Sequence, residues 1–176
     1  MASVFDPLLD LSRKPITQED FSYIVEILHK SETDSSVAIL GGALTESALT
    51  QAVLSRLRES KSGHRELFRN SAPLSSFSAV TQMGFALNIF GSEYRHDLDG
   101  IRHIRNAFAH APRELTFKNK AVSDVCDSFN ALKVTEKFNE TPVTARDKFS
   151  FTIRTVSMFL ILASEMPSRP DRPDLP

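Results

Sequence analysis

Apolar residues recur every three or four positions along most of this chain, which is the period of α-helices with one buried face. A first helix is predicted to open at Thr17, because acidic residues follow it in the first turn. Its buried face would carry Phe21, Ile24, Val25 and Leu28. Further helices are predicted at 36–59, from Ser75 or Ser76 to Gly91, at 93–109 with Ser92 as the cap, at 119–132, and from Thr144, paired with Asp147, to Glu165.

Two short segments, Leu115 to Phe117 and Val134 to Phe138, could be extended instead. Neither is a useful run of alternating apolar and polar residues, and no repeat of about 20–50 residues occurs. The sequence therefore predicts an all-α fold, a single bundle of five or six helices over residues 17–166, with an N-terminal arm at 1–16. Residues 167–176 contain four prolines and are predicted to form a disordered tail.

The composition is that of a soluble globular protein, since 41% of the 176 residues are hydrophobic and 24% are charged. The net charge of −1 argues against a general binder of nucleic acids, which needs a surplus of basic residues. A single cysteine, Cys126, excludes a disulfide framework and fits a reducing cytoplasm. With no run of about 18 apolar residues, no helix is expected to span a membrane.

Two apolar features bear on packing and assembly. Gly41 and Gly42 lie early in the second predicted helix, where they indicate either close approach of a neighbouring helix or a helix that starts after them. The segment from Met158 to Leu162 is apolar on all sides and is therefore predicted to be buried on more than one side. Burial inside the domain and burial in an interface are both open, and a homodimer is the expected assembly.

The candidate chemistry lies on the helix predicted at 93–109 and on the residue that follows it. On a helical wheel, Arg102, Asn106 and His110 share one polar side. Arg105 lies at the edge of the apolar side, where a guanidinium group needs a partner.

These residues support two interpretations. An arginine, an amide and a histidine near one helix end could bind a phosphate, with His110 moving a proton near neutral pH. Alternatively, Arg105 and Asn106 hold neighbouring helices together, and His110 interacts with the last carbonyl groups of its helix. Glu46 is expected to pair with Arg102 or Arg105. If that carboxylate is buried, removing Arg105 would cost roughly 3–5 kcal/mol.

No metal or cofactor is expected. His96, His103 and His110 recur every seven residues, which separates neighbours by about 10.5 Å along a helix, too far to share one ion. Asp99 and His103 could share an ion, but two ligands are too few for a firm site. Gly41 and Gly42 are not followed by the lysine and the serine or threonine that a phosphate-binding loop needs.

The segment from Ile101 to His110 resembles the signature IRxIRNxFAH of the bacterial mannitol operon repressor (MltR-like) family. The segments at 41–46 and 73–78 and the region from Phe117 to Cys126 are also similar to parts of that family. The resemblance therefore spans about residues 36–165. The family in turn resembles, more distantly, the HEPN superfamily of small helical domains.

Each resemblance implies a function. The first implies a negative regulator of transcription of a sugar-alcohol (mannitol) operon. Because the chain has no recognisable helix-turn-helix, zinc finger or basic arm, we expect it to act through a protein partner, with weak or no direct DNA binding.

HEPN ribonucleases carry an arginine and a histidine separated by four to six residues, as Arg105 and His110 are. The alternative is therefore an RNA-binding protein or metal-independent endoribonuclease with Arg105, Asn106 and His110 as its site. Glu46 and Arg102 would then be supporting residues.

Overall fold

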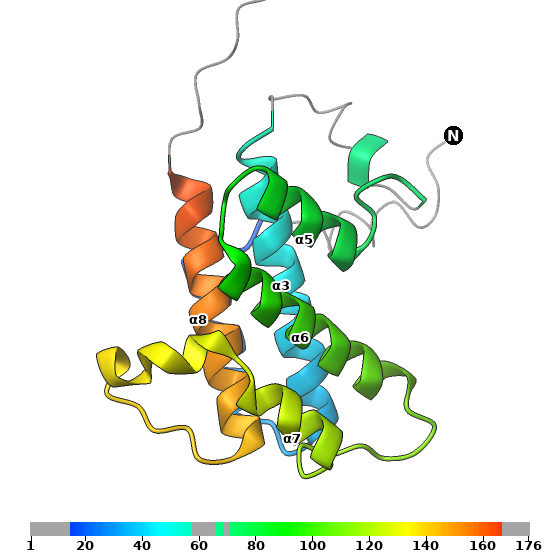
Figure 1. The fold of residues 1–176 in the computed structure, drawn as a ribbon, viewed down its shortest axis with the longest axis vertical. Coiled ribbons are helices and arrows are strands. Elements are labelled where there is room, and N and C mark those ends of the chain that lie inside the picture. The colour runs from blue at the N-terminus through cyan, green and yellow to red at the C-terminus, as the bar shows by residue number, and fades with distance from the viewer. Residues whose placement is uncertain (1–14, 58–65, 69–70, 167–176) are drawn as a thin grey trace, which may run out of the picture.

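The computed structural model describes residues 15–57, 66–68 and 71–166, and within these ranges it is all-helical with no β-strand (Figure 1). The predicted all-α fold is confirmed. The predicted disordered tail and all but the last two residues of the predicted arm lie outside the described residues. The elements are α2 (Gln18–Lys30), α3 (Asp34–Leu54), α5 (Phe77–Ala86), α6 (Ser92–His110), α7 (Lys120–Asp127), the 3₁₀ helix η1 (Asn130–Phe138) and α8 (Ala145–Glu165).

Side-chain caps set several helix starts where the sequence predicts them. Thr17 and Thr144 each form a capping box, in which the hydroxyl accepts from the backbone of the third helical residue and that residue's carboxylate accepts from the cap backbone. Ser76 caps α5 by accepting a hydrogen bond from the Ala79 backbone. The expected cap at Ser92 is wrong, because α6 includes Ser92 and starts after Gly91 without a side-chain cap.

The helices α3 and α8 run side by side through the centre of the fold, and α6 crosses them (Figure 1). The buried apolar side chains form one cluster to which all three helices contribute. Among the described helices, α3 alone is long and apolar enough to span a membrane by length and composition. Its buried residues, which include Val37, Ala48 and Leu49, pack inside the bundle and account for that composition.

The two glycines of α3 mark close helix contacts, as one of their two interpretations predicts. Gly41 faces α8, where an added Cβ would lie 3.1 Å from Cγ1 of Ile153. Gly42 faces α6, where an added Cβ would lie 2.6 Å from Cγ and 2.7 Å from Cβ of Arg105. A Cβ at Gly42 could fit only if α3 and α6 moved apart, because the atoms it meets are held close to the α6 backbone.

The helix predicted at 119–132 divides in the structure. α7 ends at Asp127, and the segment from Val134 to Phe138, considered as extended, belongs to the 3₁₀ helix η1. The cause is Asp97, which is 2% exposed. Its carboxylate accepts the backbone N–H groups of Asn130 and Ala131, both at 2.8 Å, and so stabilises the start of η1. Burial raises the pKa of Asp97, although these hydrogen bonds oppose the shift.

The apolar segment at 158–162 is buried on some sides only. Leu160 and Ile161 belong to the core, whereas Met158 and Leu162 are 45% and 44% exposed. The expectation of burial inside the domain therefore holds for part of the segment, and one side of α8 presents apolar surface to solvent.

We expect Asp97→Asn to lower the free energy of unfolding by about 2–3 kcal/mol, because an amide NH₂ would face a buried backbone N–H. The control Asp99→Asn, on the same helix, should cost less than about 1 kcal/mol because it weakens only a half-exposed ion pair with Arg102. Urea unfolding measures both values. Equal losses in the two variants would show that Asp97 does not hold η1.

Candidate functional site

Arg105 joins α6 to α3 at the centre of the predicted site. Its guanidinium donates from Nη2 to Oε2 of Glu46 at 3.3 Å and from Nη1 to Oδ1 of Asn106 at 2.9 Å. The aliphatic part of the side chain lies over Gly42, so the missing Cβ there is what allows the close approach. Three of the predicted residues, Arg105, Asn106 and Glu46, are therefore in contact.

Arg102 belongs to a separate cluster. It pairs with Asp99, with 3.4 Å between Nη2 and Oδ1, and its Nη2 lies 2.8 Å from Nε2 of His103. Of the two partners expected for Glu46, the structure selects Arg105. The reason is helical geometry, since Arg105 lies on the side of α6 that faces α3.

The ion pair between Arg105 and Glu46 lies at the surface. Their side chains are 34% and 31% exposed, so the condition of a buried carboxylate is not met. Partial burial raises the pKa of Glu46, and the nearby guanidinium only partly offsets this effect. The loss of 3–5 kcal/mol considered for removing Arg105 is thus too large, and about 1 kcal/mol or less is appropriate for such a pair.

His110 is the last residue of α6 and is exposed. It forms no hydrogen bond or ion pair with any described residue. His110 follows Arg105 by five positions, so the two side chains leave the helix about 140° apart. The structure therefore does not bring His110 and Arg105 together on one side of α6, while His110 and Asn106 share the polar side as predicted.

In the part of the chain that the structure describes, possible metal ligands do not gather. Within the described ranges, no group of three or more histidine, cysteine, aspartate or glutamate residues could hold an ion together. His96, the first of the seven-residue series, lies instead 3.2 Å from the hydroxyl of Ser128.

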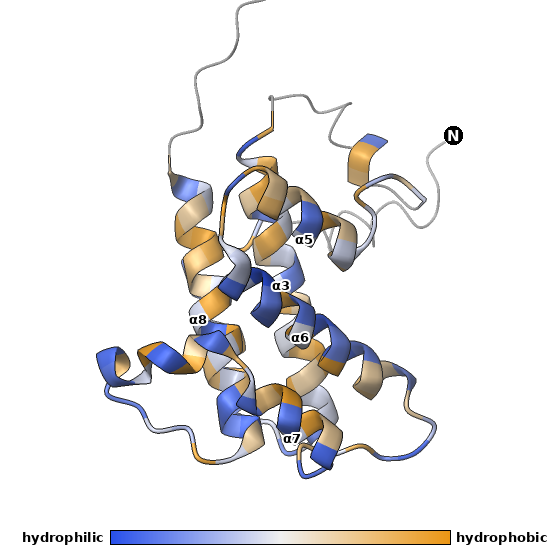
Figure 2. Ribbon diagram, viewed as in Figure 1, coloured by the Kyte–Doolittle hydropathy of each residue, from blue (hydrophilic) through white to orange (hydrophobic). Residues whose placement is uncertain are grey.

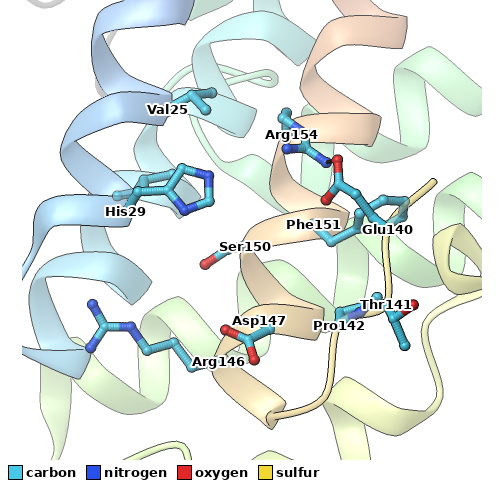
Figure 3. Close-up of a pocket in the computed structure, with 11 residues that line it drawn as sticks. Val25, His29, Glu140, Thr141, Pro142, Arg146, Asp147, Ser150, Phe151 and Arg154 are labelled. Carbon is cyan, nitrogen blue, oxygen red and sulfur yellow. Dashed lines mark hydrogen bonds and ion pairs between the residues drawn. The ribbon is translucent and has the colours of Figure 1, made fainter. Parts of the chain in front are cut away.

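A pocket of about 270 Å³ lies where α2, α8 and the residues before α8 meet (Figure 3). Arg154 pairs with Glu140. Arg146 pairs with Asp34 at 3.1 Å and also donates to the backbone carbonyl of Ser31. Sequence reasoning missed this pocket because no local motif marks its arginines. Both are already paired with acidic side chains, so the pocket presents no uncompensated arginine to a ligand.

Comparison with known proteins identifies the fold. No protein-family model matches the chain, and no curated protein matches it. Solved structures do match it, among them the following two. MtlR, in the X-ray structure of the MtlR–HPr complex from Escherichia coli, has a TM-score of 0.65 and 14% identity, covering 82% of this chain and 99% of that one. A possible transcriptional regulator, YggD from Shigella flexneri, has a TM-score of 0.63 and 14% identity, covering 85% of this chain and 99% of that one.

The chain therefore has the all-α fold of MtlR and YggD over almost the whole length of both. This agrees with the fold that the repressor resemblance implies. At 14% identity the likeness establishes the fold and no more. The resemblance to HEPN proteins stays a prediction from the sequence.

The contact of Arg105 with Gly42 predicts coupled mutations. Gly42→Ala should lower the free energy of unfolding by about 1–3 kcal/mol, because the new methyl group would clash with the Arg105 side chain. Arg105→Ala should cost about 1 kcal/mol or less. A double variant of Gly42→Ala with Arg105→Gly should lose less than the sum of its two single variants, because glycine removes both Cγ and the Cβ that would lie 2.7 Å from the new methyl group. Arg105→Ala keeps that Cβ and should relieve the clash less. Gly91→Ala is the control for coupling, since no atom outside its own neighbourhood lies within 4 Å of the added Cβ, and its loss should add to that of the same Arg105 variant. Strictly additive losses, measured by urea unfolding, would contradict the contact.

The raised pKa of Glu46 predicts a pH dependence. Its stabilising contribution is fully present below the ordinary value of 4.5 and is lost as the pH rises through the higher pKa of the folded state. The free energy of unfolding of Glu46→Gln, measured relative to the wild type, should therefore increase as the pH is raised from about 4 to about 7. The gain should be larger in an Arg105→Ala background, where no guanidinium opposes the shift. Urea unfolding of the variant and the wild type at both pH values tests this. A variant whose relative stability increases as the pH is lowered would contradict it.

Proposed function

We propose that this chain is a regulatory protein that represses transcription of a sugar-alcohol operon by binding a partner protein. The observation that carries the proposal is the shared fold with MtlR, which extends over 99% of the MtlR chain. That MtlR structure is a complex with the protein HPr. An HPr-like protein is therefore the first partner to test.

The charge of the chain supports an indirect mode of action. Its net charge is −1, and a protein that neutralises several DNA phosphates needs a basic surface. In the described part of the chain, the arginines at 102, 105, 146 and 154 each pair with an acidic side chain. Repression through a partner needs no such surface.

The ribonuclease alternative assigns Arg105 and His110 to one phosphate, with the histidine as acid or base and the arginine stabilising the transition state. Within a single chain, their separation of about 140° around α6 and the pairing of Arg105 with Glu46 both count against this arrangement. His110 remains exposed and available at the helix end. The role of Arg105, Asn106 and His110 in RNA cleavage is thus a prediction to be tested beside the proposed function.

We expect the purified chain to bind HPr from its own host with a dissociation constant near the micromolar range, about −8 kcal/mol in binding free energy. It should not bind the operator DNA of a mannitol operon tightly at physiological salt when no other protein is present. Calorimetry measures the first interaction and a fluorescence-anisotropy titration measures the second. In the host, deleting the gene should raise transcripts of sugar-alcohol uptake genes.

The same preparation, incubated with total RNA in a chelator beside a His110→Ala variant, tests the alternative. RNA cleavage by the wild type that the variant lacks would replace the proposed function with the enzymatic one. Tight, sequence-selective binding of operator DNA by the chain alone would contradict the indirect mode of repression.

A further inference from the structure

An uncovered apolar stripe runs along the C-terminal half of α8. Met158, Leu162 and Met166 are spaced by four residues, so they share one side of the helix axis, and they are 45%, 44% and 56% exposed. In Figures 1 and 2 this half of α8 lies at the upper left edge of the fold, and most of it is coloured as hydrophobic. We call these three residues the α8 stripe.

Aromatic side chains flank the α8 stripe. On one side, Phe159 stacks on Tyr94 of α6, with 4.3 Å between the ring centres. At the lower end, Phe138 of η1 is 47% exposed and packs edge-on against Phe151, which precedes Met158 by two turns on α8. Aromatic residues and methionine are the residue types enriched in protein interfaces, and arginine, present here as Arg154, is a third.

We propose that the α8 stripe is the interface of a two-fold homodimer in which α8 packs antiparallel to α8 of a second copy. A two-fold axis at the level of residue 160 places Met158 opposite Leu162 of the second copy, and the reverse contact follows by symmetry. Unbranched methionine side chains adapt to an opposing helix surface, so this pairing can close without voids.

Charges beside the stripe complement each other in this register. Arg154 and Glu165 lie eleven residues apart and therefore only about 20° apart around α8, on the same side of the stripe. Antiparallel pairing about residue 160 brings each Arg154 to the level of Glu165 of the other copy, twice per dimer. Arg154 already pairs with Glu140 but keeps further N–H donors for a second carboxylate.

The helix pair alone would be a narrow contact. From Arg154 to its end at Glu165, α8 covers about 17 Å, whereas stable interfaces bury about 800 Å² on each partner. The ring of Phe159 widens the apolar surface on one side of the stripe, and the ring of Phe138 extends it at the lower end. Dimerisation of this kind does not depend on whether the chain regulates a gene.

Sedimentation equilibrium tests the assembly. The wild type should be dimeric at about 50 μM, and Met158→Glu should raise the dissociation constant of the dimer at least about tenfold, because it places a charge against an apolar side chain. Tyr23→Glu is the matched control, since Tyr23 is 63% exposed on α2 and its replacement should leave the dimer intact. A monomeric wild type, or equal effects of the two variants, would overturn the proposal.

Disulfide crosslinking tests the register and does not depend on the folding of the glutamate variant. A Met158→Cys chain is mixed with a Leu162→Cys chain and oxidised. The antiparallel register predicts that the mixed disulfide exceeds either symmetric one at least about fivefold. The native thiol of Cys126 should not interfere, because it is fully buried and burial raises its pKa to about 12. Predominant 158–158 crosslinks, or none, would overturn the register.

Discussion

The close packing of α3 against α6 and α8 is the constraint on which the rest of the fold depends. Gly41 and Gly42 are adjacent in sequence and so point about 100° apart, one toward α8 and the other toward the Arg105 side chain on α6. One turn after Gly41, the buried hydroxyl of Thr45 lies 3.0 Å from that of Ser157. Such a polar contact between helices is possible only because the backbones are close enough for short side chains to meet. Two missing Cβ atoms thus determine both interfaces of the central helix.

The same constraint explains the character of the candidate site. Glu46 follows Gly42 by one turn, so the arginine that lies over the glycine reaches the carboxylate with its guanidinium. Asn106 accepts a second hydrogen bond from that group and limits its orientation. An arginine held in this way serves first to join α6 to α3. A ligand that binds Arg105 must therefore either replace Glu46 or use the N–H donors that Glu46 and Asn106 leave free.

Local interactions were predictable from the sequence, and interactions between distant segments were not. The capping box at Thr144 involves residues three apart, so the pattern itself indicates it. The 3₁₀ helix at 130–138 depends on the carboxylate of Asp97, more than thirty residues earlier in the chain. No periodicity in 119–138 reveals that partner. The pairing of Arg105 with Glu46 was one of two expected choices, but its exposure depends on where α3 and α6 cross, which the sequence pattern does not specify.

The solvent-facing sides of α6 and α8 differ in polarity, and the packing of the helices within one chain does not explain the difference. Where α6 leaves the core it presents polar side chains, among them Arg102 and Asn106. Where α8 leaves the core it presents Met158 and Leu162. Polar residues at these two positions would close the same bundle, because the inward-facing Leu160 and Ile161 supply the core contacts. Exposed apolar side chains at regular helical spacing add nothing to the stability of an isolated chain and expose it to nonspecific association. The proposed contact between two copies of the chain would bury them, and that is a role that the folding of a single chain does not give them.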